Sequence, residues 1–208
     1  MTALSDSLLE RWITLAGADS EQIGAGIIGR YAEPHRRYHT QAHLAVMLTA
    51  IDELAEAATD VAAVRYAAFF HDAIYAVDRA DNEERSADLA RDVLESLGAS
   101  VALVEEVVRL VVLTRGHDVE AGDANGAVLC DADLVVLGGT PEEYAAYAAA
   151  VRDEYRHVPD DLFRAGRASV LRHLADQPRL FRTASAFGRY EARARANLGA
   201  ELVSLTTG

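Results

Sequence analysis

The chain has 208 residues, of which half are hydrophobic and a quarter are charged, and this composition is ordinary for one soluble globular domain. Its formal net charge of −13 argues against nucleic acid or an anionic membrane surface as a general partner. All 20 basic residues are arginine, which excludes a catalytic Schiff-base lysine and a P-loop lysine. Cys130 is the single cysteine, so an internal disulfide and a cysteine-built metal cluster are also excluded.

Two further features of the sequence concern its location and secondary structure. No apolar run reaches the roughly 20 residues that a membrane-spanning helix needs. The start of the chain lacks the basic and then apolar regions of a secretory signal. We therefore expect a cytoplasmic protein. Only four prolines and 14 glycines stand against many alanines and leucines, and this balance favours helices.

Apolar residues at helical spacing, together with capping residues, predict helices through the first half of the chain. Pro34 ends the second of these helices, and Thr59 is the expected N-cap of the fourth. The fourth helix is expected to end near His71 and Asp72. The predicted helices span residues 5–16, 20–32, 40–58 and about 60–71.

The second half of the chain continues the helical pattern after a polar loop over residues 78–82. Residues 115–126 hold three glycines and several acids and are predicted to form an exposed loop. The clearest helix start is Thr140-Pro141-Glu142-Glu143, which combines an N-cap, a proline at the first helical position and a capping box. Helices are predicted over residues 82–97, 100–114, 140–155, 159–175 and 185–202. The sequence thus predicts one all-α domain over residues 1–208.

Four polar clusters interrupt otherwise apolar segments. Imidazoles and carboxylates are costly to bury unless they are paired, hydrogen-bonded or bound to a metal ion. His39 and His43 lie one helical turn apart and therefore share a helix face. Asp131 and Asp133 are both candidates for a carboxylate ligand, and helical spacing does not choose between them. The clusters are Tyr38-His39-Thr40-Gln41-Ala42-His43, His71-Asp72, His117-Asp118 and Asp131-Ala132-Asp133.

The order His, His-Asp, Asp on an all-α chain resembles the HD superfamily of metal-dependent phosphohydrolases. Within that superfamily, the sequence is similar to a small bacterial group of predicted HD phosphohydrolases. The resemblance covers nearly the whole chain and implies a single HD-type helical bundle, with a metal site formed by residues from about 38 to 134. It is carried by Arg37-Tyr38-His39, Phe70-His71-Asp72, Asn82-Glu83, Thr114 with His117, Asp131-Ala132-Asp133-Leu134, Arg152 with Glu154-Tyr155, and Gly166-Arg167.

This resemblance, carried over residue by residue, implies roles for individual side chains. Asp133 is preferred to Asp131 because it directly precedes Leu134, as the ligand does in the family. His39 becomes the proton donor to the leaving group. Two histidines and two carboxylates suit a divalent ion in octahedral geometry, such as manganese, iron, cobalt, nickel or magnesium. The implied metal ligands are His43, His71, Asp72 and Asp133, and Asp72 also counts among the catalytic residues.

Several other residues are secondary candidates. Glu83 is a candidate for orienting the attacking water, with helix capping as the alternative. His117 is a candidate for binding phosphate or a second metal ion, with a loop histidine of no such role as the alternative. Arginines on helices are commonly solvated or paired with acids, but they also bind phosphate bidentately. The candidate phosphate clamps are Arg37, Arg115, Arg152 and Arg167.

The leading hypothesis is hydrolysis of a phosphate ester or anhydride by metal-activated water. The expected substrate is a small phosphorylated molecule, with a nucleotide as the first expectation. Two alternatives are a nucleotide-binding or signalling module without turnover, and a dinuclear iron oxygenase on the same scaffold. The sequence leaves open the substrate, the native metal and whether the chain forms a homodimer.

Overall fold

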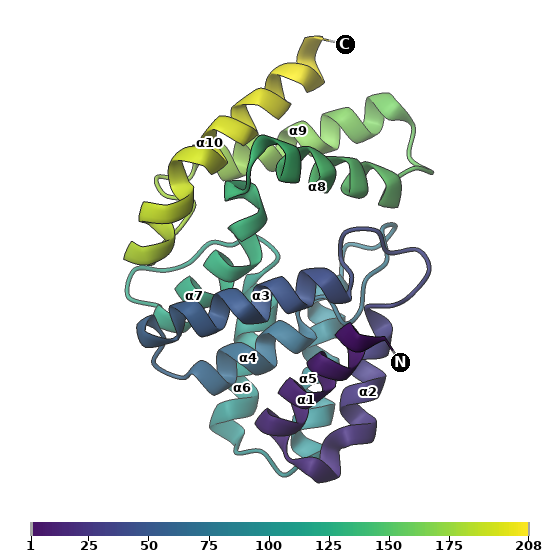
Figure 1. The fold of residues 1–208 in the computed structure, drawn as a ribbon, viewed down its shortest axis with the longest axis vertical. Coiled ribbons are helices and arrows are strands. Elements are labelled where there is room, and N and C mark those ends of the chain that lie inside the picture. Colours follow the sequence, from purple (N-terminus) through teal and green to yellow (C-terminus); the bar gives the residue numbers. More distant parts are fainter. Residues whose placement is uncertain (1, 208) are drawn as a thin grey trace.

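The computed structural model describes residues 2–207, and within them the chain forms α-helices and short 3-10 turns without a strand (Figure 1). The predicted all-α bundle is confirmed. The helices are α1 (Ala3–Ala16), α2 (Glu21–Arg30), α3 (Gln41–Leu54), α4 (Val61–Phe70), α5 (Asn82–Ser96), α6 (Val101–Leu113), α7 (Ala124–Asp133), α8 (Pro141–Glu154), α9 (Asp160–Asp176) and α10 (Ala184–Thr207). The 3-10 turns are η1 (Ala18–Ser20), η2 (Ala55–Ala57) and η3 (Leu134–Gly138).

Most helix ends follow the capping residues in the sequence. Thr140 and Glu143 form the expected capping box at the start of α8. The N-cap of α4, however, is Asp60 rather than Thr59, because the Asp60 carboxylate accepts the backbone N–H of Ala63 at 2.9 Å. Thr59 instead donates its N–H and hydroxyl to the side-chain oxygen of Asn125, at 2.9 and 3.0 Å. A contact between α4 and α7 thus overrides the local capping preference.

Other boundaries also differ from the sequence prediction. Helix α3 ends at Leu54 and is followed by η2, whereas the prediction ran to residue 58. The loop after α6 is shorter than expected, since α7 begins at Ala124. Asp123 is the N-cap of α7, because its side chain accepts the N–H of Gly126. Helix α10 continues to Thr207, beyond the predicted end near Leu202. None of the helices within residues 2–207 combines the length and the apolar character needed to cross a membrane.

Helices α1 to α7 form the lower layer of the molecule in Figure 1. Trp12 lies at its centre with no exposed surface and meets the rings of Phe69 and Phe70 edge to face, at centroid distances of 5.2 and 6.0 Å. Gly24 is required beside it, because a Cβ there would lie 2.2 Å from the indole ring. Helix α4 is buried on most of its surface, and its sequence is apolar except for Arg65, which pairs with Asp52.

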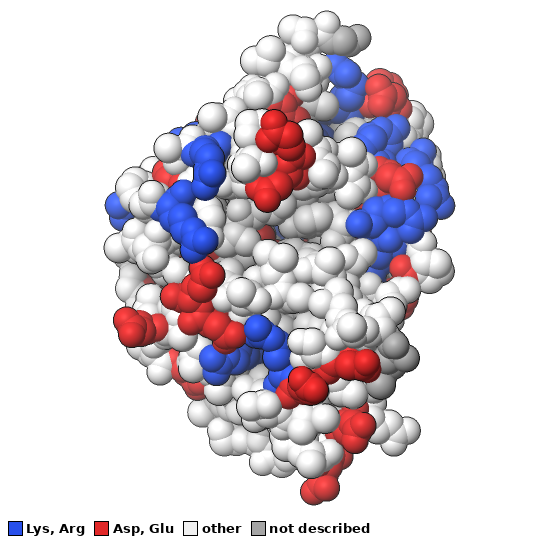
Figure 2. Space-filling view, in the orientation of Figure 1, with Lys and Arg blue, Asp and Glu red and all other residues white. Residues whose placement is uncertain are grey.

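Helices α8, α9 and α10 form the upper layer. Helix α8 packs on η3, α9 packs on α10, and α10 packs on η3. The Asn197 side chain of α10 donates to the carbonyls of Leu137 and Gly139, which fastens α10 to η3. On the face drawn in Figure 2, uncharged atoms occupy the centre between the two layers, with charged side chains around them. The candidate site lies between these layers.

Candidate metal centre

Three buried or half-buried side chains from different helices converge below the upper layer. His43 belongs to α3, His71 follows α4, and Asp133 ends α7. One ligand atom from each lies within 4.8 Å of the others. The His43 Nε2 is 3.2 Å from the His71 Nε2 and 3.1 Å from the Asp133 Oδ1. These residues could hold a metal ion.

The hydrogen bonds of His71 show why a cation suits this cluster. The His71 Nδ1 lies 2.7 Å from the Ala68 carbonyl oxygen, which can only accept, so Nδ1 carries a hydrogen. The neutral ring therefore turns the lone pair of Nε2 toward the His43 Nε2 and toward the Asp72 Oδ2, at 3.2 and 3.0 Å. Facing lone pairs need a proton or a metal ion between them. When no ion is bound, burial opposes protonation, but the carboxylates of Asp72 and Asp133 outweigh it and raise the pKa of His71 to about 9.

Asp72 lies beside the three converging residues. Its Oδ2 is 4.0 Å from the His43 Nε2. Burial acts to raise the pKa of Asp72, but His71 and His39 outweigh burial and hold the pKa well below its ordinary value. The structure thus brings together all four side chains that the resemblance implied as ligands. The donor set of two imidazoles and two carboxylates fits a borderline divalent ion.

Asp131 and Asp133 lie in different environments. Asp131 has no exposed surface, and its carboxylate accepts the N–H groups of Arg182 and Thr183 at 2.7 and 2.8 Å, and the Thr183 hydroxyl at 2.7 Å. Asp131 therefore holds the segment before α10. Asp133 faces the two histidines instead, so the structure separates two acids that helical spacing did not.

His39 is held by a glutamate from the upper layer. The His39 Nδ1 lies 2.7 Å from the Glu154 Oε2 at the end of α8. The other oxygen, Oε1, accepts the backbone N–H groups of Arg37, Tyr38 and His39 at 2.7, 2.9 and 3.0 Å. Because Nδ1 donates to the carboxylate, the His39 Nε2 is the ring nitrogen left for a reactant.

This arrangement favours the protonated form of His39. Burial alone would lower the pKa of His39, but Asp72 and Glu154 outweigh it and raise the pKa above the ordinary value. Glu154 is itself buried, and despite that burial its bonds to His39 and to the backbone lower its pKa to about 2. No role was predicted for Glu154, because His39 and the backbone groups it binds lie more than 110 residues away in the sequence.

Arg36 is a second residue whose part in the site was missed. Its side chain is buried between the rings of Tyr31 and Tyr75, at 5.1 and 5.3 Å. Its Nη1 donates to the carbonyls of His39 and Asp72, at 3.1 and 2.8 Å. Arg36 thereby joins the two segments that carry site residues. In the sequence, Arg36 stands in an arginine-rich turn, and such a turn is usually exposed to solvent.

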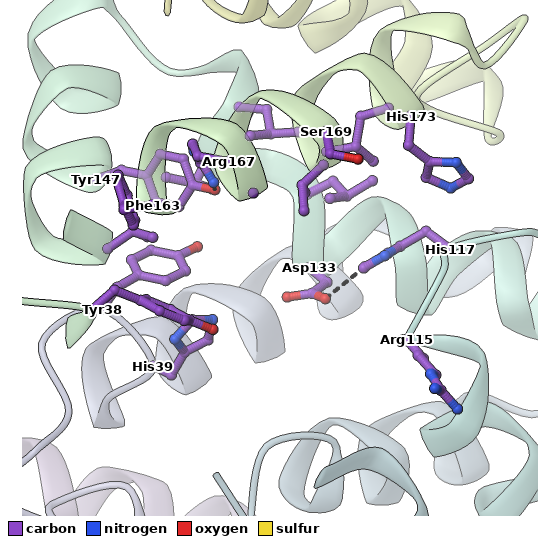
Figure 3. A pocket seen from close by; sticks show the side chains of 18 of the residues that line it. Tyr38, His39, Arg115, His117, Asp133, Tyr147, Phe163, Arg167, Ser169 and His173 are labelled. Carbon is purple, nitrogen blue, oxygen red and sulfur yellow. Dashed lines mark hydrogen bonds and ion pairs between the residues drawn. The ribbon is translucent and has the colours of Figure 1, made fainter. Parts of the chain in front are cut away.

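His117 contacts the metal cluster from the loop after α6. Its Nε2 lies 2.8 Å from the Asp133 Oδ2 (Figure 3). His43 contacts the other oxygen of the same carboxylate. His117 has a φ of 54°, which is uncommon for a residue other than glycine. Its backbone N–H donates to the Leu113 carbonyl, at the end of α6. The structure therefore places this secondary candidate at the cluster.

A cavity of about 780 Å³ opens from this cluster toward α8 and α9. His39, Asp133 and His117 line one end, and mainly apolar side chains of η3, α8 and α9 line the rest. Figure 3 shows Asp133 beneath α9, between His117 on one side and Tyr38 and His39 on the other. A reactant in this cavity would meet both Asp133 and His39.

Two of the arginines predicted as phosphate clamps line the cavity, but both have acidic partners. Arg167 binds Glu201 through two nitrogens, at 2.8 and 3.0 Å. Arg115 pairs with Glu84 and turns away from Asp133 in Figure 3.

The other two predicted clamps and Glu83 are not part of the cavity lining. The Arg37 Nε donates to the Asp153 carboxylate at 2.7 Å. Arg152 donates to the Tyr155 and Val158 carbonyls, at 2.8 and 3.3 Å, and so closes the end of α8. Glu83 stands in the first turn of α5, and partial burial raises its pKa. A carboxylate in the first turn interacts favourably with the helix dipole.

Comparison of the chain with protein-family models, with curated proteins and with solved structures found no match. The helical fold and the His43, His71 and Asp133 cluster are compatible with an HD domain. The geometry of the site is therefore the basis on which a function is proposed.

Proposed function

We propose that the protein is a metal-dependent phosphohydrolase of the HD type. Its substrate would be a small phosphorylated molecule, with nucleotides as the first class to test, and it would act in the cytoplasm without a nucleic-acid or membrane partner. One observation supports the proposal above all others. Asp133 of the convergent cluster lines the same cavity as His39, whose pKa is raised above its ordinary value.

The chain's residues divide the work between them. His43, His71, Asp72 and Asp133 would hold a divalent ion, which supplies a Lewis acid for the phosphoryl group and lowers the pKa of bound water. His39 donates a proton to the departing oxygen, because its Nε2 is the nitrogen that Glu154 leaves free. Glu154 fixes the His39 ring, and Arg36 holds the His39 and Asp72 backbones together.

Removal and return of the metal test this function. The protein is purified without chelator, its metal content is measured, and phosphate release is followed on a panel of phosphate esters and anhydrides. We expect activity to disappear when a chelator removes the ion and to return with manganese, iron, cobalt, nickel or magnesium. Full activity of metal-free protein would contradict the proposal. A ligand that raises the melting temperature of metal-loaded protein without being hydrolysed would favour a non-catalytic nucleotide-binding module.

One observation favours a second candidate, the dinuclear iron oxygenase. Asp133 directs one oxygen toward His43 and the other toward His117, so His117 could serve as an additional ligand if two ions were bound. About two iron ions per chain, together with oxygen uptake, would support this function over hydrolysis.

A further inference from the structure

The cavity beside the metal centre has the size and lining of a site for an organic molecule. Its volume of about 780 Å³ lies within the roughly 300–1,000 Å³ typical of small-molecule pockets. Away from the metal centre, its walls include Leu137 of η3, Val151 of α8 and Phe163 of α9. A ligand whose phosphoryl group reaches Asp133 would therefore lay the rest of its body against apolar side chains.

The charged side chains around the cavity can neutralise one phosphoryl group rather than several. Arg115 and Arg167 are the arginines among the described lining residues, and each is paired with a glutamate. Arg167 also donates to the Tyr147 hydroxyl at 3.1 Å, so its donors are directed into the protein. A second or third phosphate beyond the metal centre would be desolvated without a free cation to pair with.

Helix α9 leaves room for such an organic body. Gly166 lines the cavity, and a Cβ built there meets no atom within 4 Å. Leu162 and Val170 lie one turn to either side of Gly166, line the same cavity and are 61% and 53% exposed. Large apolar side chains exposed together in this way mark a surface that receives an apolar group.

We propose that the site takes a phosphate monoester whose organic body is uncharged and largely apolar, such as an alkyl chain bearing one or two rings. This inference rests on the proposed function for the position of the phosphoryl group, and it places the body beneath α9 at Gly166. In the reaction, water adds to phosphorus and the ester P–O bond breaks. The electron pair of that bond goes to the leaving oxygen, which takes the proton of His39. The proton lost by water restores His39, so the products are an alcohol and inorganic phosphate.

Binding of two phosphonates, which cannot be hydrolysed, tests the apolar body. Titration calorimetry on manganese-loaded protein compares 2-naphthylmethylphosphonate with ethylphosphonate. We expect the naphthyl compound to bind at least tenfold more tightly, with a more negative heat-capacity change from apolar burial. Equal affinities would overturn the inference.

A variant of Gly166 locates the body. Gly166→Leu puts a side chain into open space and raises helix propensity, so the fold should persist. The Gly166→Leu variant should bind the naphthyl compound at least tenfold more weakly, and its affinity for ethylphosphonate should not change. Gly199→Leu is the matched control, because Gly199 is an exposed glycine of α10 with equal space around its Cβ. Unchanged affinity of Gly166→Leu for the naphthyl compound would contradict this position.

Measuring the hydrolysis of four phosphate compounds tests this inference separately from the proposed function. The substrates are 2-naphthylmethyl phosphate, ethyl phosphate, adenosine monophosphate and adenosine triphosphate. The three monoesters all release primary alcohols, so differences in kcat/KM among them reflect the body. We expect the naphthylmethyl ester to exceed each of the others at least tenfold. Preferred hydrolysis of either nucleotide would overturn the inference and support the phosphohydrolase. If no phosphate compound were hydrolysed, the proposed function would fail, whereas the phosphonate titrations would still test the cavity.

Discussion

The lower and upper layers contribute to the site in different ways. The lower layer carries the side chains that could bind a metal, and it holds them on helices whose neighbouring residues are apolar. The upper layer carries Glu154 and one wall of the cavity, on helices with many exposed charges. A polar residue therefore stands out in the sequence of the lower-layer helices but not in that of the upper-layer helices. The difference teaches that candidate metal ligands can be recognised along a sequence, whereas the glutamate that contacts His39 and the walls of the cavity cannot.

The largest loss of metal affinity and activity is expected when a candidate ligand in the lower layer is replaced. Asp133→Ala removes a carboxylate that faces both His43 and His71. Changes to the outer partners of metal ligands cost roughly 10- to 100-fold in affinity, so loss of a ligand should exceed about 100-fold. Metal content after dialysis and phosphate release measure the effect, and both should fall together.

Asp131→Asn is the matched control for that variant. It leaves an amide group facing N–H donors in a buried position, so the free energy of unfolding should fall by about 1–3 kcal/mol. Its metal content should stay at the wild-type level. Loss of the metal from Asp131→Asn but not from Asp133→Ala would reverse the assignment of the two acids.

An intermediate effect is expected from Glu154→Gln in the upper layer. The amide oxygen can still accept the backbone N–H groups, but the negative charge beside His39 is lost. General acid catalysis contributes roughly 100- to 10,000-fold, and we expect kcat to fall by about 10- to 100-fold with unchanged metal content. Steady-state kinetics and metal analysis on the same preparation test this expectation.

The pH profile of Glu154→Gln separates orientation of His39 from a general loss of stability. The Glu154 carboxylate raises the pKa of His39, and a proton donor loses activity as the pH rises through its pKa. Removing that charge lowers the pKa of His39, so the alkaline limb of the profile should move to lower pH. An unshifted limb would mean that Glu154 only holds the backbone.

In the wild type, the lowered pKa of Glu154 adds stability that is lost as the pH falls from about 4.5 toward about 2.

The smallest effect is expected at the exposed junction between the layers. Arg37→Ala removes an ion pair with Asp153 outside the cavity. Exposed ion pairs contribute little, so unfolding free energy should change by about 0.5 kcal/mol or less, and kcat/KM by about twofold or less. A tenfold loss of kcat/KM would restore Arg37 as a phosphate clamp and extend the substrate site to this junction.

Sequence patterns predicted the helices well because their causes are local. The capping box at Thr140 involves residues three positions apart, and amphipathic spacing repeats within one helix. The error at Thr59 shows the limit, since Asn125 reaches it from a distant helix. The candidate ligands were also recognisable, because a buried His71 or Asp133 needs a compensating charge wherever it lies in the fold.

What the sequence by itself determined is therefore the all-α architecture and the residue types of a metal site. The tertiary structure alone decided that Glu154 orients His39 and that an apolar cavity adjoins His39 and Asp133. It also showed that Asp133 faces the histidines, as the resemblance had implied and helical spacing had not. The physical reason is distance along the chain. These features arise from contacts between helices far apart in sequence, and they depend on how the two layers pack together.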